Sequence, residues 1–133
     1  MRKLVALTLL VIGAMSLGSL VAGADFAEWR LPGGLPFGNA LAAIGLCCLA
    51  GASLALSPGG SLRRHAARAS LAAAALWLPV SVALAGNLSL NFPGGLGTAW
   101  MAVTATTVGI VLVSLGLTVA GLLFRVRHGS TSA

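Results

Sequence analysis

The sequence predicts an all-α integral membrane protein whose four transmembrane helices form two tandem hairpins. Three observations lead to this fold class. First, 58% of the 133 residues are hydrophobic and only 8% are charged, whereas soluble domains are roughly 45–50% apolar and about 25% charged. Second, four long apolar runs alternate with short polar segments. Third, the second half of the chain resembles the first.

The four apolar runs are each long enough to cross a bilayer, because a hydrocarbon core of about 30 Å needs about 20 helical residues. Their central parts contain no Asp, Glu, Lys, Arg or His. Membrane strands would alternate apolar and polar residues over about 10 positions, which these runs do not. We therefore predict a single transmembrane domain over residues 1–133, with helical spans at about 4–23, 39–57, 66–86 and 98–124.

The charged residues predict how the chain crosses the membrane. In a four-span arrangement both acids, Asp25 and Glu28, fall on one side with Arg30, and the other basic residues fall on the opposite side. These are Arg2, Lys3, Arg63, Arg64, Arg68, Arg125 and Arg127. The positive-inside rule makes that second side cytoplasmic, so both termini are expected inside. The Ala, Leu and Gly bias is typical of a GC-rich bacterial genome, and we expect a bacterial cytoplasmic (inner) membrane protein.

The first span has an alternative interpretation as a cleaved signal peptide. Arg2 and Lys3 precede an apolar stretch that ends in Ala22-Gly23-Ala24, the small-residue pattern of a cleavage site. The apolar run is long for a signal peptide, and the internal repeat gives this span a counterpart in the second half. We expect the segment to be retained, although the residues leave cleavage of 1–24 open.

The internal repeat appears when the chain is aligned with itself at an offset of 61 residues. Arg2 then falls on Arg63, and Ser53-Leu54 falls on Ser114-Leu115. The repeat units cover about 2–62 and 63–127. Each unit contains two spans, so the two hairpins have the same orientation and are related by an axis along the membrane normal.

A Pro-Gly-Gly turn on the outer face is predicted inside each unit. Proline cannot continue a helix, and glycine accepts positive φ without steric cost. The turn residues are Pro32, Gly33, Gly34, Pro93, Gly94 and Gly95. Aromatic rings gather at the same face, where they favour the headgroup level or a partner contact. They are Phe26, Trp29, Phe37, Phe92 and Trp100.

Small residues at intervals of four predict where the helices pack, because close approach in lipid depends on small side chains. One stripe lies on the first span (Ala14, Gly18, Ala22) and one on the second (Ala43, Cys47, Gly51, Ala55). We expect most of these positions to pack within the chain and some to face another chain. The fourth span carries hydroxyls at Thr104, Thr107, Ser114 and Thr118, which would line the path of an oligomeric pore.

Few residues carry chemistry. The adjacent thiols of Cys47 and Cys48 could transfer a metal ion, but buried free cysteine commonly acts as a small apolar side chain, and we predict packing. An intramembrane ionisable residue, which transport usually requires, is missing from the central part of every predicted span. No basic cluster is long enough to indicate nucleic-acid binding. We assign no catalytic residue, no metal site and no cofactor, although a bound lipid is compatible with the sequence.

The function most compatible with these features is an accessory or structural subunit of a larger membrane complex. Its partners would be membrane lipids and other membrane protein subunits, with a hetero-complex favoured over a homo-oligomer. An oligomeric small channel, holin-like pore or transporter is the alternative. An assembly or metal-handling factor is the third interpretation.

Overall fold

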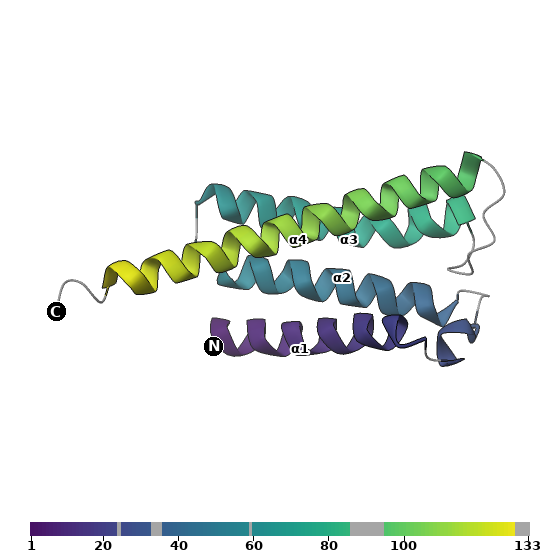
Figure 1. Cartoon of the computed structure of the whole chain (residues 1–133), viewed down its shortest axis with the longest axis horizontal. Helices are drawn as coiled ribbons and strands as arrows, with labels where there is room; N and C mark the ends of the chain where they lie inside the picture. The colour runs from purple at the N-terminus through teal and green to yellow at the C-terminus, as the bar shows by residue number, and fades with distance from the viewer. Residues whose placement is uncertain (24, 33–35, 59, 86–94, 130–133) are drawn as a thin grey trace.

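Four long helices form the protein, and each contains a segment long and apolar enough to span a membrane (Figure 1). The structure is a computed structural model that describes residues 1–23, 25–32, 36–58, 60–85 and 95–129. The helices are α1 (Arg2–Val21), α2 (Phe37–Leu56), α3 (Leu62–Ala85) and α4 (Gly95–Gly129), and a short 3-10 helix, η1 (Asp25–Glu28), follows α1. The predicted all-helical class, with four helices long and apolar enough to span a membrane, is confirmed.

Local sequence explains the junction between α2 and α3. Pro58 biases the preceding residue towards extended backbone, and Ser57 accordingly has φ −76° and ψ 134° and ends α2. Gly60 then turns the chain with φ +68°, a conformation that glycine adopts without strain. Ser61 caps α3, since its hydroxyl accepts the backbone N–H of Arg64 at 3.2 Å.

The helices α3 and α4 begin earlier than the apolar runs predict. α3 starts at Leu62 rather than near Ala66, and α4 starts at Gly95 rather than near Thr98. The first turns of α3 contain Arg63, Arg64 and Arg68. Hydropathy detects the part of a helix that suits lipid, so it misses polar turns that project beyond the hydrocarbon.

The helices pair as two hairpins, α1 with α2 and α3 with α4. The two hairpins are joined by α2, which also packs against α3 and, less extensively, against α4. Within the described residues, α1 packs extensively against no long helix other than α2. Met1 and the last turn of α4 lie at one end of the bundle, which we name the termini end, and η1 lies at the other, the η1 end (Figure 1). α2 and α4 therefore run in the same direction.

Small side chains dominate the core between the helices. Ala50, Ala52, Ala67 and Ala74 have no exposed surface, and the largest fully buried side chain is Trp77 at 2% exposure. Helices in lipid gain little from hydrophobicity and associate through close packing and interhelical hydrogen bonds. The alanine-rich core allows close packing, and the hydroxyl and tryptophan contacts described below provide interhelical hydrogen bonds.

Candidate functional site

Four hydroxyls between α2 and α4 form what we name the hydroxyl cluster: Ser53, Ser57, Ser114 and Thr118. Ser53 Oγ lies 2.9 Å from Ser114 Oγ, 2.8 Å from Thr118 Oγ1 and 3.1 Å from the Ser114 carbonyl oxygen. Ser57 Oγ lies 3.3 Å from Thr118 Oγ1. All four side chains are at most 3% exposed. The cluster therefore satisfies polar groups that would be costly to leave unbonded in an apolar medium.

Two contacts of the hydroxyl cluster join positions that the sequence alignment makes equivalent. Ser53 contacts Ser114, and Ser57 contacts Thr118, and both pairs are 61 residues apart. The two helices involved run in the same direction (Figure 1). Two pairs of positions that the predicted repeat makes equivalent are thus neighbours at the same depth in the bundle.

A second polar set joins α3 to α4. The Trp77 indole donates its Nε1–H to Thr104 Oγ1 at 3.0 Å, and Trp100 donates to Ser81 Oγ at 2.7 Å. The two indole rings lie 6.5 Å apart. Trp100 is only 7% exposed, so its ring packs inside the bundle, and whether it also reaches headgroups or a partner stays a prediction. A hydroxyl on the facing helix satisfies its indole N–H, which lets the whole ring pack inside.

The other aromatic residues predicted for the outer face lie around η1. The Phe26 ring contacts Trp29 at 6.5 Å and Phe37 at 6.0 Å, both edge to face. Trp29 is 70% exposed. Its carbonyl oxygen accepts the Phe37 N–H at 2.7 Å, which closes the segment before α2. Whether these rings contact headgroups or a partner stays a prediction, and Phe92 lies outside the described residues.

The turn motifs are described only in part. Pro32 is exposed, while Gly33, Gly34, Pro93 and Gly94 lie outside the described residues. Gly95 is the first residue of α4, and the positive-φ glycines of the described chain are Gly23 and Gly60. Gly95 therefore starts a helix and does not supply a positive-φ turn position.

The closest approach of α1 and α2 occurs at Gly13 and Gly45. A Cβ atom on Gly45 would lie 2.6 Å from Leu17 Cγ, and one on Gly13 would lie 3.2 Å from the Gly45 carbonyl oxygen. A side chain at Gly45 would force Leu17 to move, and one at Gly13 would fit only if its neighbours gave way slightly. These two glycines, which the stripe analysis does not select, set the separation of the first hairpin.

The predicted packing stripes have different outcomes on α1 and α2. On α2, Ala43 is buried, and Cys47, Gly51 and Ala55 are half-buried. On α1, Ala14, Gly18 and Ala22 are all exposed, and a Cβ on Gly18 would meet nothing within 4 Å. The α1 stripe therefore does not pack within this chain, because α1 contacts α2 through the face of Gly13 instead. That the stripe packs against another chain stays a prediction.

Cys47 and Cys48 contact different neighbours. Cys47 packs against the buried core, whereas Cys48 lies beside α1, with its Cβ 3.3 Å from the place where a Cβ on Gly13 would be. Among the described residues, no third His, Cys, Asp or Glu joins them in a metal-binding group. Both thiols are free.

Basic side chains gather at the termini end of α3. Arg64 donates from Nη1 to the Ser57 carbonyl oxygen at 3.3 Å, which ties the start of α3 to the end of α2. The Arg63 guanidinium occupies the space beside Gly121 on α4, where a Cβ would collide with it. Basic side chains at this end of the bundle are able to attract anionic headgroups.

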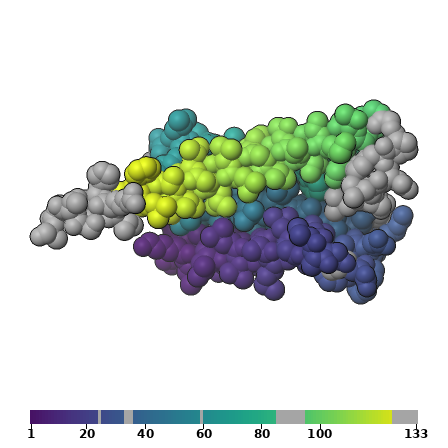
Figure 2. Space-filling model, in the orientation of Figure 1, coloured from purple at the N-terminus to yellow at the C-terminus, as the bar shows by residue number. Residues whose placement is uncertain are grey.

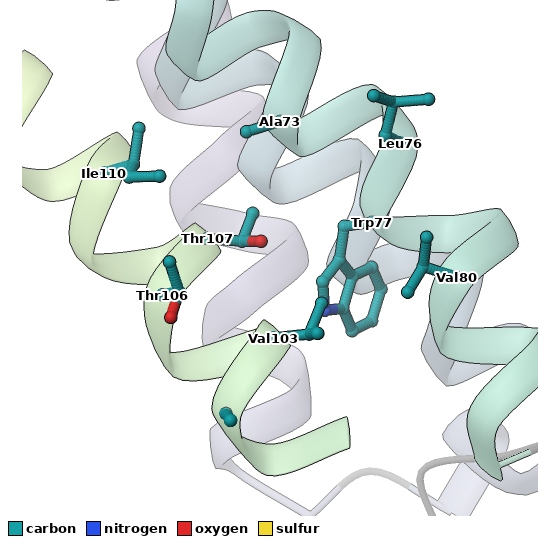
Figure 3. Close-up of a pocket in the computed structure, with 9 residues that line it drawn as sticks. Ala73, Leu76, Trp77, Val80, Val103, Thr106, Thr107 and Ile110 are labelled. Carbon is teal, nitrogen blue, oxygen red and sulfur yellow. The ribbon is translucent and has the colours of Figure 1, made fainter. Parts of the chain in front are cut away.

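Two apolar grooves open on the surface of the bundle. One, of about 300 Å³, lies between α1 and α4 over α2, and Figure 2 shows α1 and α4 on one face of the molecule. Its lining residues are Leu17, Leu20, Val21, Leu46, Leu49, Val108, Val111 and Leu112. The other, of about 400 Å³, lies between α3 and α4 (Figure 3). We name this second one the α3/α4 groove.

Two buried polar residues escaped the sequence analysis. Asn39 is completely buried near the start of α2, and neither its side-chain oxygen nor its nitrogen has a hydrogen-bond partner. Ser53 makes most of the contacts of the hydroxyl cluster, whereas the sequence indicates it only as a match in the repeat. A polar residue inside an apolar run is a usable signal for both, although the facing partner cannot be named from it.

The arrangement combines buried hydroxyl contacts between hairpins with exposed small residues and apolar grooves at the surface. Such features are typical of helix association in membranes. Comparison of the chain with models of protein families, with curated proteins and with solved structures finds no match.

Proposed function

We propose that the protein is an accessory or structural subunit that docks sideways, through α1, against another protein of a bacterial cytoplasmic-membrane complex. One observation carries this proposal: the stripe of Ala14, Gly18 and Ala22 is exposed. Small residues exposed to lipid add nothing to packing, whereas at a helix contact they let two backbones approach closely. A partner helix on this face would use them.

The position of α1 in the bundle supports the same proposal. α1 packs extensively against α2 alone among the long helices, so most of its circumference is available to another protein. Leu7 is 59% exposed, Val11 50% and Met15 71%. Large apolar side chains beside small ones suit knobs-into-holes contact with a partner helix.

The pore alternative loses three of the four hydroxyls that support it, while the fourth, Thr107, lines the α3/α4 groove. Ser114 and Thr118 belong to the hydroxyl cluster, and Thr104 accepts the Trp77 N–H. Hydroxyls used inside the bundle do not line a path between chains. The third interpretation, an assembly or metal-handling factor, still rests on Cys47 and Cys48 alone.

Replacing Gly18 with Leu tests the proposal. The larger side chain has room within the chain but would hold a partner helix away, at a cost of about 1–3 kcal/mol, or roughly 5- to 150-fold in affinity. The matched control is Gly116→Leu on α4, because a Cβ there also meets nothing within 4 Å. Tagged variants would be extracted gently from the native membrane and sized by native gel.

We expect the wild type and Gly116→Leu to migrate with a larger complex, and Gly18→Leu to be released from it. Identical migration of all three within a large complex would show that α1 is not the docking face. A wild-type chain that migrates without any second protein would contradict the subunit proposal itself.

A further inference from the structure

The α3/α4 groove contains two hydroxyls that lack hydrogen-bond partners. Thr107 is only 6% exposed and lines the groove, and Thr106 is exposed at its edge (Figure 3). Neither hydroxyl bonds to a carbonyl of its own helix or to any other residue that the structure describes. An unbonded hydroxyl in an apolar medium is unfavourable, so the groove calls for an occupant with a hydrogen-bonding group.

The depth of Thr107 restricts what that occupant can be. Thr107 lies twelve residues (107 − 95) after the start of α4, which is about 18 Å along the helix axis. That position is near the middle of a hydrocarbon core of about 30 Å. Phospholipid headgroups lie outside this region, so the partner of the Thr107 hydroxyl must be carried into the hydrocarbon.

The walls of the groove admit another helix. Ala73 on α3 and Ala102 on α4 are among the residues that line it, and Trp77, with its N–H already bonded to Thr104, offers only its ring. Small side chains allow a neighbouring backbone to come close. The groove has a volume of about 400 Å³, which is enough for the side chains of a helix that lies along it but not for the helix itself.

We infer that a second copy of this chain covers the α3/α4 groove, with α4 of each copy lying against the groove of the other. Two copies inserted with the same topology are related by a two-fold axis along the membrane normal, so identical residues lie at the same depth. A hydroxyl both donates and accepts. Thr106 of each copy would therefore bond to Thr107 of the other, and every unpartnered hydroxyl of the groove would be satisfied.

The chain itself contains a precedent for this contact. α2 and α4 run in the same direction and are joined by hydroxyls at equal depth, with Ser53 Oγ 2.9 Å from Ser114 Oγ. The proposed pair of α4 helices would also be parallel and joined by hydroxyls. This dimer uses the opposite side of the bundle from α1, so it is compatible with the proposed subunit function and goes beyond it.

Disulfide trapping of the purified full-length protein tests the inference. In a Cys47→Ala, Cys48→Ala background, Thr106→Cys would be oxidised in lipid nanodiscs and analysed on a non-reducing gel. The matched control is Leu112→Cys, because Leu112 is 54% exposed on the same helix but lines the other groove, the one between α1 and α4. We expect a cross-linked dimer for Thr106→Cys and monomer for Leu112→Cys. No dimer, or equal dimer from both variants, would overturn the inference.

The Thr107→Val variant tests the hydroxyl contact itself, since valine keeps the shape and removes the hydroxyl. Interhelical hydrogen bonds in membranes average about 0.6 kcal/mol, so losing two reciprocal bonds should weaken the dimer roughly eightfold. Förster transfer between labelled copies at increasing dilution measures this. An unchanged dissociation constant, or a monomer that carries a bound lipid-soluble molecule in native mass spectrometry, would refute the dimer. Because only pure protein is used, either result leaves the α1 docking experiment standing.

Discussion

Ser53 is the residue on which the polar contacts between the two hairpins converge. Its hydroxyl lies within hydrogen-bond distance of Ser114 and Thr118, and its carbonyl oxygen accepts the Ser57 hydroxyl at 2.8 Å. The site has no exposed surface, so water cannot replace a lost partner. This single residue thus contacts three neighbours, two of them through its hydroxyl and one through its carbonyl oxygen.

The Ser53→Ala substitution should therefore destabilise the bundle by about 1–3 kcal/mol, the cost of leaving buried polar groups unsatisfied. The control is Ser19→Ala, since Ser19 makes only a local bond to the Ser16 carbonyl oxygen within α1. Unfolding in mixed detergent micelles, followed by circular dichroism, measures both variants. Equal loss in the two would show that the hydroxyl cluster adds nothing to the joining of the hairpins.

At the scale of elements, the helix pair α1–α2 depends on backbone proximity rather than on hydrogen bonds. Gly45 faces Leu17, and Gly13 faces the Gly45 carbonyl oxygen. The pair α3–α4 is different, because two tryptophans reach across it to hydroxyls. The two hairpins are therefore held together by different kinds of contact, close backbone packing in the first and side-chain hydrogen bonds in the second.

We expect Gly45→Ala to push α1 away from α2. Overpacking typically costs about 1–3 kcal/mol, and the better helix propensity of alanine offsets about 1 kcal/mol of that. Gly18→Ala, on the exposed side of α1, should be neutral or slightly stabilising. Thermal unfolding of the two variants in the same detergent compares them, and a Gly45→Ala protein as stable as Gly18→Ala would contradict the tight contact.

At the scale of the whole molecule, both ends of the long helical bundle have a distinct character. The termini end carries Arg2, Arg63 and Arg64, while the η1 end carries Asp25 and Glu28 (Figure 1). An excess of Lys and Arg marks the cytoplasmic side of membrane proteins. This asymmetry would orient the protein in the membrane.

Cysteine labelling of intact cells should show that orientation. In a background without Cys47 and Cys48, Glu28→Cys at the η1 end is expected to react with a membrane-impermeant maleimide. Arg68→Cys, exposed on α3 near the termini end, is expected to react only after the cells are permeabilised. The reverse pattern would place the termini outside and invert the predicted topology.

The helical spans could be predicted because each depends on a property of its own segment. A continuous apolar run of about 20 residues has few stable forms in lipid other than a helix. The packing faces could not be predicted in this way, because α1 has small residues on more than one side. α1 packs against α2 through Gly13 rather than through the stripe of Gly18, because Gly45 and Cys48 of α2 lie beside Gly13. The sequence of α1 carries no information about these neighbours.

The same division explains the candidate sites. The amino-acid sequence by itself determined the membrane class, the four helices and the distribution of charge, since these follow from local hydropathy and from counting charged side chains. Only the tertiary structure decided that Trp100 is buried, that Ser53 contacts Ser114, and that the Thr107 hydroxyl has no hydrogen-bond partner among the described residues. Each of these depends on which side chain another helix presents at the same depth, and that is a property of the pair of helices.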